Sequence, residues 1–329
     1  MLLSKKTQHA DRKHEHQAHH ERIPPPPFQF QHYLFPDGTS GIQEVIVSVI
    51  SKLSPTTIME SITRLSIPMR WGIILNISFV FSMGCSTIPN SFTPYNPIPP
   101  ETFTHETFHQ ALIAHVKNGV VDYPQLAHDS HFKRYINLLE HIAPQQLPTP
   151  NHRLAFWINV YNAFAIKGIL NGDSPATLTG RYTFFIGRTY VVGEESLNLY
   201  DLEQHLLIPD FKEPRIHFAI VCASQSCPKL QSAAYTPESL DQQLTASAQQ
   251  FINDPTRNRF DRQRRIAHLS KIFDWFSKDF INHSGSLLGY VAQFVSDPDL
   301  ANDIRQNAYT IEFLDYDWSL NGVPPFSPK

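Results

Sequence analysis

Side chains that can carry out chemistry gather in one short segment. His217, Cys222, Ser226 and Cys227 all fall within it, and Pro228 follows directly. A residue before proline is biased toward extended geometry, and proline fits the first turn of a helix, so the sequence predicts a helical turn from Pro228 with Cys227 as its N-cap. A thiol at a helix N-terminus has a lowered pKa and is more nucleophilic. Cys227 is therefore the stronger candidate nucleophile, and Cys222 is the weaker one.

A thiolate nucleophile needs a base, and His217 and His205 are the two candidates. His217 and Cys222 fall on one predicted strand, where a separation of five residues puts them on opposite faces. Asn159 and Asn162 share one face of a predicted helix, from which they could orient the histidine or bind an oxyanion. The resulting hypothesis is a hydrolase or acyl-transferase that uses a cysteine and a histidine as papain-like enzymes do.

The alternative is that the two cysteines form a disulfide. In an oxidising compartment Cys222 and Cys227 can pair and close a small loop, which contributes on the order of 2 kcal/mol in the chain-entropy model. His217 is then a core histidine, and the two asparagines bind buried backbone. Because proximity of cysteine and histidine in a sequence is an unspecific signal, the disulfide is favoured, and both alternatives stay open.

Two carboxylates near the C-terminus form a second candidate site. Asp315 and Asp317 lie two residues apart and would share one face of a strand, as a carboxylate pair or a metal site requires. No histidine or glutamate stands at metal-ligand spacing nearby, so Asx turns at a strand end are favoured and we expect no metal. The chain also lacks a glycine-rich phosphate loop and a CxxC motif, and we expect no cofactor.

The charge balance argues against nucleic acid as a partner. With 27 basic and 30 acidic residues the chain has no broad positive field to hold phosphates. A hydrophobic content of 41% is enough for a sizeable core, which excludes a chain that is disordered or fibrous throughout.

The elements that must position these residues are mostly helices. A helix over residues 151–170, capped by Asn151, is apolar nearly all round and should be the buried centre of the domain. The remaining predicted helices cover residues 103–116, 132–143, 199–207, 236–252, 271–280 and 286–295. The predicted strands are a hairpin of 182–186 with 189–192, a buried strand over 215–222 and a closing strand over 309–315. The total is a single α+β domain, mostly helical, around a small sheet.

Four blocks in this order resemble the DUF547 domain, a domain of unknown function found in bacterial lipoproteins and in plant and animal proteins. The blocks are Leu154-Ala-Phe-Trp-Ile-Asn-Val-Tyr-Asn-Ala163, Ile216 to Leu230, Leu269 to Phe276 followed by Asp279-Phe280, and Tyr316-Asp-Trp-Ser-Leu-Asn321. The resemblance covers roughly residues 105–321. Because the family has no settled biochemistry, the resemblance implies a domain and no reaction.

The chain also carries an apparent signal for lipid attachment. Residues 71–82 are apolar and uncharged, Arg70 precedes them, and Cys85 follows. The apolar run is too short for a bilayer of about 30 Å and has the length of a signal-peptide core. The segment resembles the lipobox of bacterial lipoproteins, although Ser82 stands where leucine is usual. The resemblance implies that Cys85 is acylated and becomes the mature N-terminus.

These signals predict the domain organisation. Residues 1–68, with a histidine-rich run, are expected to be a non-native or disordered extension ahead of a start at Met69. A signal peptide over 69–84, a proline-rich tether over 85–102 and a DUF547-like domain over 103–329 follow. We expect a lipid-anchored protein of the bacterial cell envelope that faces the periplasm or the cell surface. It is either a cysteine-dependent enzyme or a binding or scaffold module for an unknown envelope partner.

Overall fold

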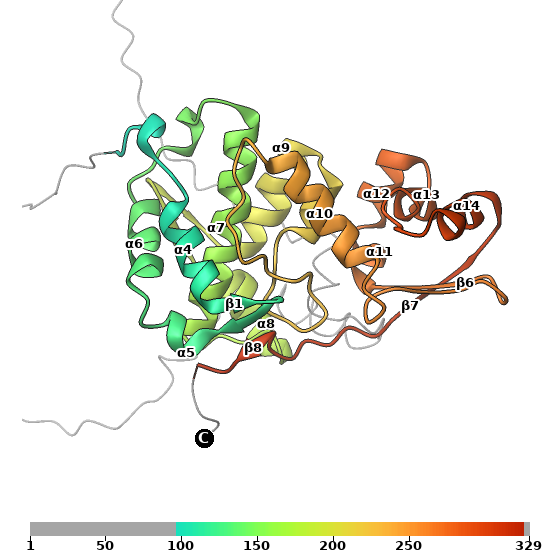
Figure 1. Cartoon of the computed structure of the whole chain (residues 1–329). Helices are drawn as coiled ribbons and strands as arrows, with labels where there is room; N and C mark the ends of the chain where they lie inside the picture. The colour runs from blue at the N-terminus through green and yellow to red at the C-terminus, as the bar shows by residue number, and fades with distance from the viewer. Residues whose placement is uncertain (1–96, 326–329) are drawn as a thin grey trace, which may run out of the picture.

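A computed structural model describes residues 97–325 of the chain (Figure 1). These residues form an α+β domain that is mostly helical and contains small sheets of two or three strands, which confirms the predicted fold class. In this described part, no helix has both the length and the apolar character needed to cross a membrane. The predicted extension, the signal peptide and Cys85 lie outside the described residues.

The centre of the fold is α7 (Pro150–Leu170), which is buried over most of its length as predicted. The cap differs from the prediction, because the side chain of Thr149 closes the first turn and Asn151 lies inside the helix. At the other end Gly172 takes a φ of 91°, a conformation that ends helices and that favours glycine. α7 is therefore a rigid support from which side chains reach neighbouring segments.

Shorter helices surround this centre. Figure 1 shows α4 and α6 on one side of α7, and α12, α13 and α14 at the opposite end of the molecule. The helices are α4 (Glu106–His115), α5 (Tyr123–Leu126), α6 (Ser130–Leu139), α8 (Leu178–Tyr182), α9 (Ile208–Phe211), α10 (Leu240–Ile252), α11 (Lys271–Trp275), α12 (Ser277–Ser284), α13 (Leu287–Val291) and α14 (Pro298–Gln306). Short 3₁₀ and π turns join them, namely η1 (Pro100–Thr102), η2 (Pro144–Gln146), η3 (Thr183–Gly187), η4 (Asp201–Leu207) and η5 (Pro214–Phe218).

The strands are short and form separate sheets. In the first sheet β1 (Val116–Lys117) pairs antiparallel with β2 (Val120–Asp122), and β2 pairs parallel with β8 (Gly322–Val323). The second is a hairpin of β3 (Tyr190–Val192) and β4 (Glu195–Leu197). In the third, β6 (Ile266–Leu269) pairs antiparallel with β5 (Arg259–Asp261) and parallel with β7 (Thr310–Phe313). The pairing of β2 with β8 brings the end of the domain back to its beginning.

The predicted hairpin of 182–186 with 189–192 is wrong in its first half. Residues 182–186 are helical, in α8 and η3, and the second half pairs instead with β4. The side chain of Thr177 accepts a hydrogen bond from the Gly180 N–H and so caps α8. Phe184 and Phe185 are both buried, although neighbours in a strand would face opposite sides. Helical burial of both rings overrides the β propensity of this aromatic run.

The predicted buried strand over 215–222 is also wrong. Its first half is the 3₁₀ turn η5, where the carboxylate of Glu213 accepts the Arg215 N–H, and its second half is irregular, with a turn at Ala219 and no strand pairing. The other predicted elements correspond to helices or strands whose ends differ. The helix of 236–252 begins at Leu240, the one of 271–280 is divided into α11 and α12, and the strand of 309–315 is β7.

Candidate functional site

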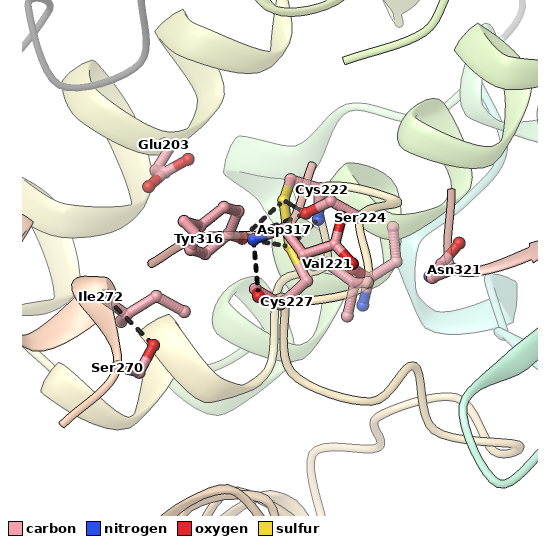
Figure 2. The surroundings of a disulfide bond; sticks show 12 residues. Glu203, Val221, Cys222, Ser224, Cys227, Ser270, Ile272, Tyr316, Asp317 and Asn321 are labelled. Carbon is pink, nitrogen blue, oxygen red and sulfur yellow. Dashed lines mark hydrogen bonds between the residues drawn. A yellow bond between two sulfur atoms is a disulfide. The ribbon is translucent and has the colours of Figure 1, made fainter. Parts of the chain in front are cut away.

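Cys222 and Cys227 are joined in a disulfide (Figure 2). Both cysteines are buried, with 9% of the surface of Cys222 and 3% of the surface of Cys227 exposed. The predicted helical turn at Pro228 is absent, because the residues that follow it are not helical and Leu230 forms a β-bridge with Gly119. Cys227 therefore does not lie at a helix N-terminus, and its sulfur is contacted instead by hydrogen-bond donors from other segments.

Those donors come from three residues close to the sulfur atoms (Figure 2). The Cys222 N–H donates to Cys227 Sγ over 3.0 Å, and the Tyr316 hydroxyl donates to the same sulfur over 3.1 Å. The Ser224 hydroxyl lies 3.1 Å from the Tyr316 oxygen and 3.0 Å from Cys222 Sγ. Burial raises the pKa of Tyr316 above its ordinary value, so its hydroxyl stays protonated. The disulfide is thus surrounded by groups that donate hydrogen bonds.

Asn162 of α7 holds the loop that carries Cys222. Its side-chain Nδ2 donates to the Ala219 carbonyl over 3.0 Å, and its Oδ1 accepts the Val221 N–H over 2.8 Å. Asn159, one turn earlier, binds the backbone N–H and carbonyl of Tyr235 in the same way. Both side chains therefore bind buried backbone, and Asn162 does so in the segment that leads into the disulfide.

The C-terminal segment holds the other side of the loop. The Gln225 N–H donates to the Ser319 carbonyl over 2.7 Å, and the Asn321 N–H donates to the Ala223 carbonyl over 3.0 Å. Ala223 has a φ of 61°, in the left-handed region, which turns the chain between the two cysteines. This pairing carries Tyr316 to the sulfur atoms from 89 residues away in the sequence.

His217 is oriented by a carboxylate. Its Nε2 donates to Asp279 Oδ2 over 2.8 Å, and its ring stacks on Phe276 with the ring centres 3.9 Å apart. The other nitrogen, Nδ1, is buried and has no hydrogen-bond partner among the described residues. With the proton on Nε2, Nδ1 carries the lone pair of the ring and is a base without an occupied partner.

His217 lies between two cavities. The smaller, of about 30 Å³, is lined by His217, both cysteines, Glu203 and Tyr316, with apolar walls that include Trp275 and Phe276. The larger, of about 460 Å³, is lined by His217 with Asp279, Ile208, Pro209, Lys212, Glu213, Pro214, Asn282 and His283. Hydrogen bonds from Arg215 outweigh burial and hold the pKa of Glu213 below its ordinary value. The residues around the smaller cavity form the disulfide site.

The comparison with known families identifies part of this region. Residues 144–252 match the sequence model of a family described as a protein of unknown function, DUF547. The chain carries a DUF547 domain. The matched residues include α7, both cysteines and His217, whereas Asp279 and Tyr316 lie beyond them. No curated protein and no solved structure matches the chain.

The DUF547 domain does not bring His205 into the disulfide site. His205 is half exposed on η4, its Nδ1 pairs with Asp201 over 3.1 Å, and it lines neither cavity. Glu203, two residues earlier, lines the smaller cavity and accepts a hydrogen bond from the Tyr161 hydroxyl over 3.2 Å. Of the two predicted bases, His217 is the one that shares a cavity with the cysteines.

The predicted carboxylate pair is not a pair on one strand face. β7 ends at Phe313, so Asp315 and Asp317 both lie beyond it. Asp317 accepts the Ser319 N–H over 2.9 Å, which confirms the Asx-turn alternative for this residue. Hydrogen bonds from the side chain and then the backbone of Ser319 hold the pKa of Asp317 below its ordinary value. Among the residues described, no group of three or more histidine, cysteine or acidic side chains is placed to hold a metal ion.

Sequence reasoning missed two members of the disulfide site, Glu203 and Tyr316, and the residue Asp279 that orients His217. Glu203, Asp279 and Tyr316 each come from a different segment, and only the tertiary fold brings them to His217 and the cysteines. Asp279 and Tyr316 fall in two of the blocks that resemble the family, which was a signal for them. For Glu203 the signal was an acidic residue directly after Leu202 in a predicted helix with a buried face.

Proposed function

We propose that this protein is a lipid-anchored lipoprotein of the bacterial cell envelope whose DUF547 domain is a cysteine-dependent hydrolase or acyl-transferase. The disulfide is then the resting, oxidised form of the site, and reduction releases Cys227 as the nucleophile. The single observation that carries the enzymatic part is His217, which is oriented by Asp279, keeps Nδ1 without a partner, and lines the same small cavity as both sulfur atoms. A nucleophile, a base and a group that orients the base is the arrangement that covalent catalysis requires.

The first step of the proposed cycle is reduction. Two molecules of a thiol reductant give up two hydrogens, which leaves Cys222 and Cys227 as thiols and the reductant as its own disulfide. The Cys227 proton then passes to His217 Nδ1, while Asp279 stabilises the imidazolium ion through Nε2. The sulfur is thereby freed to attack a carbonyl carbon.

The second step is acyl transfer. Attack by Cys227 forms a thioester, and the leaving group departs with the proton that His217 received. Water or another acceptor then attacks the thioester. His217 takes a proton from that acceptor and returns it to the Cys227 sulfur, which restores the dithiol and releases the acylated product.

Turnover of activated esters and thioesters by the full chain tests this function. We expect turnover after reduction, no turnover before reduction, loss in Cys227→Ala and retention in Cys222→Ala. The retention separates the nucleophile from its partner, because each variant removes the disulfide equally. Absence of turnover from the reduced protein across a panel of acyl donors would contradict the enzymatic proposal.

The proposed anchoring rests on the sequence alone. Arg70, the apolar residues 71–82 and Cys85 occur in the order of a lipoprotein signal. Pro97 begins the described part, and the intervening dozen residues can span at most about 40 Å. Metabolic labelling with a clickable fatty acid in a bacterial host should label the protein and fail with Cys85→Ala. Tryptic peptides from before Met69 in the native protein would contradict a signal peptide at this position.

A second candidate function is a binding or scaffold module of the envelope with a structural Cys222–Cys227 disulfide. The observation that favours it is the burial of both sulfur atoms together with the larger cavity beside His217. Under this alternative, reduction requires unfolding. A disulfide that resists millimolar thiol in the native protein would favour the module over the enzyme.

A further inference from the structure

The hydrogen bonds around the disulfide differ in kind between its two sulfur atoms. Cys222 Sγ lies 3.0 Å from the Ser224 hydroxyl and 3.2 Å from the Tyr316 hydroxyl, whereas Cys227 Sγ contacts a hydroxyl and a backbone N–H. Cys227 Sγ accepts the Cys222 N–H over 3.0 Å and the Tyr316 hydroxyl over 3.1 Å. The Ser224 hydroxyl donates to the Tyr316 oxygen over 3.1 Å, so the hydroxyl protons run in one direction, from Ser224 to Tyr316 to Cys227. A sulfur in a disulfide is a weak acceptor, whereas a thiolate is a strong one that gains from each charge-assisted donor.

We infer that Tyr316 is a positioning residue that, with Ser224 and the Cys222 N–H, holds reduced Cys227 as a thiolate. A role of this thiolate in catalysis rests on the proposed function, whereas the hydrogen bonds to Cys227 are independent of that function. A chain of hydroxyl donors strengthens each of its bonds, because every donation polarises the next hydroxyl. The backbone N–H selects Cys227 over Cys222, whose sulfur contacts the Ser224 and Tyr316 hydroxyls but no backbone N–H among its hydrogen-bond contacts.

Hydrogen bonds besides the bond between the two sulfur atoms hold the segment of the two cysteines. Asn162 fixes the backbone before Cys222, and the Ser226 N–H donates to the Asp317 carbonyl over 3.0 Å, next to Tyr316. Cys227 itself is tied to the loop by its N–H, which donates to the Ser224 carbonyl over 3.2 Å. Reduction takes up two electrons and two protons from a thiol reductant and leaves these backbone contacts in place.

Some charged and titratable groups around the disulfide site favour a thiolate at Cys227, and others disfavour it. From η4, Glu203 brings a carboxylate that disfavours a second negative charge, and Tyr161 of α7 binds that carboxylate. From η5, His217 favours a thiolate when it is protonated. From outside the cavity, Arg257 lowers the pKa of Tyr316 and Asp317 raises it. Tyr316 is the one side chain of this set that contacts Cys227 Sγ through a hydrogen bond.

Alkylation of the reduced full chain tests the inference. Iodoacetamide is added over a range of pH, and the modification of Cys227 is read separately from that of Cys222 and Cys85 by peptide mapping. In Tyr316→Phe we expect the pH midpoint of Cys227 alkylation to rise by about one unit, as the loss of one hydrogen bond to a charged group implies. Ser224→Ala should move the midpoint in the same direction by less, because it removes only the polarising donor.

The matched control is Tyr161→Phe. It removes a hydroxyl from the same cavity, but one that bonds to Glu203 instead of sulfur, so the midpoint should shift by less than in Tyr316→Phe. An unchanged profile in Tyr316→Phe, or an equal shift in both tyrosine variants, would overturn the inference. The outcome is independent of the proposed function. A thiolate at Cys227 without ester turnover would contradict only the function, and turnover with an unchanged Tyr316→Phe profile would contradict only the inference.

Discussion

His105 and His217 each lie against more than one aromatic ring, and they differ in the hydrogen bonds of their ring nitrogens. His105 lies among Phe103, Tyr135 and Phe156, and its Nδ1 bonds to the Tyr135 hydroxyl over 2.8 Å. His217 also stacks on a phenylalanine, but a carboxylate holds one nitrogen and the other has no partner. The first histidine completes a core, and the second lies between two cavities.

The difference shows what turns a buried histidine into a base. Burial, with a smaller effect of His152, lowers the pKa of His105 to about 3, so the ring stays neutral and exchanges no proton near neutral pH. At His217 Asp279 can balance an imidazolium charge, and a small cavity with two sulfur atoms lies beside the ring.

The largest effect is expected from removing the base. His217→Ala should reduce ester turnover by the reduced protein on the order of 10²–10³-fold, because the Cys227 proton then has no acceptor. His105→Phe in the aromatic core should leave turnover of the folded protein unchanged. Equal losses in the two variants would break the comparison and indicate a shared effect on folding, which thermal unfolding of both variants measures.

A smaller loss is expected from removing the orienting carboxylate. Asp279→Asn keeps the size of the side chain but removes the charge that stabilises the His217 imidazolium, so turnover should fall about 10- to 100-fold. Asp201→Asn is the matched control, since it removes the carboxylate beside the half-exposed His205. Steady-state rates of the two variants separate them, and a comparable loss in Asp201→Asn would show that His205 takes part.

The two asparagines of α7 permit a comparison within one helix. Asn159→Ala and Asn162→Ala each leave one buried backbone N–H and one carbonyl without a partner, which should lower the free energy of unfolding by about 2 kcal/mol or more. Only Asn162→Ala loosens the loop before Cys222, so it alone should slow Cys227 alkylation in the folded protein. Denaturant unfolding and alkylation rates test the two statements separately.

The smallest effect concerns pH and stability. His105 has a folded pKa below that of the unfolded chain, so the unfolded state binds more protons between about pH 6.5 and pH 3. Its contribution to stability is therefore complete above about pH 6.5 and is lost as the pH falls, by about 2 kcal/mol at pH 5. His105→Phe should reduce this slope in denaturant unfolding between pH 7.5 and pH 5. An identical slope in the variant would show that another group is responsible.

The sequence allowed the framework of the domain to be predicted, because the framework is local. The central helix and the α+β class follow from apolar periodicity, and the pairing of Cys222 with Cys227 was the favoured one of two open alternatives. The strand predicted over 215–222 failed because the backbone of that apolar segment is bound by Asn162, a side chain 57 and 59 residues away. A side chain that replaces a strand partner leaves no periodic signal.

The site itself was predicted only in part, for the same reason. Both cysteines and His217 are close in sequence and were found, whereas Tyr316 and Asp279 come from the C-terminal half. The backbone-binding role that the disulfide alternative predicted for Asn162 is confirmed, since the oxygen and the nitrogen of its amide group both bind backbone, whereas the enzymatic alternative assigned it to the histidine or an oxyanion. Contacts that depend on the return of the chain through β8 cannot be inferred from spacing.

The most direct test of the account is capture of the acyl-enzyme. The reduced full chain is mixed with an acyl donor, quenched with acid within milliseconds to seconds, and analysed by intact mass and peptide mapping. The account predicts one acyl group on Cys227, absent from the oxidised protein and from Cys227→Ala, and formed more slowly in His217→Ala. A reduced protein that carries no acyl group, or one that carries it on a residue other than Cys227, would contradict the account.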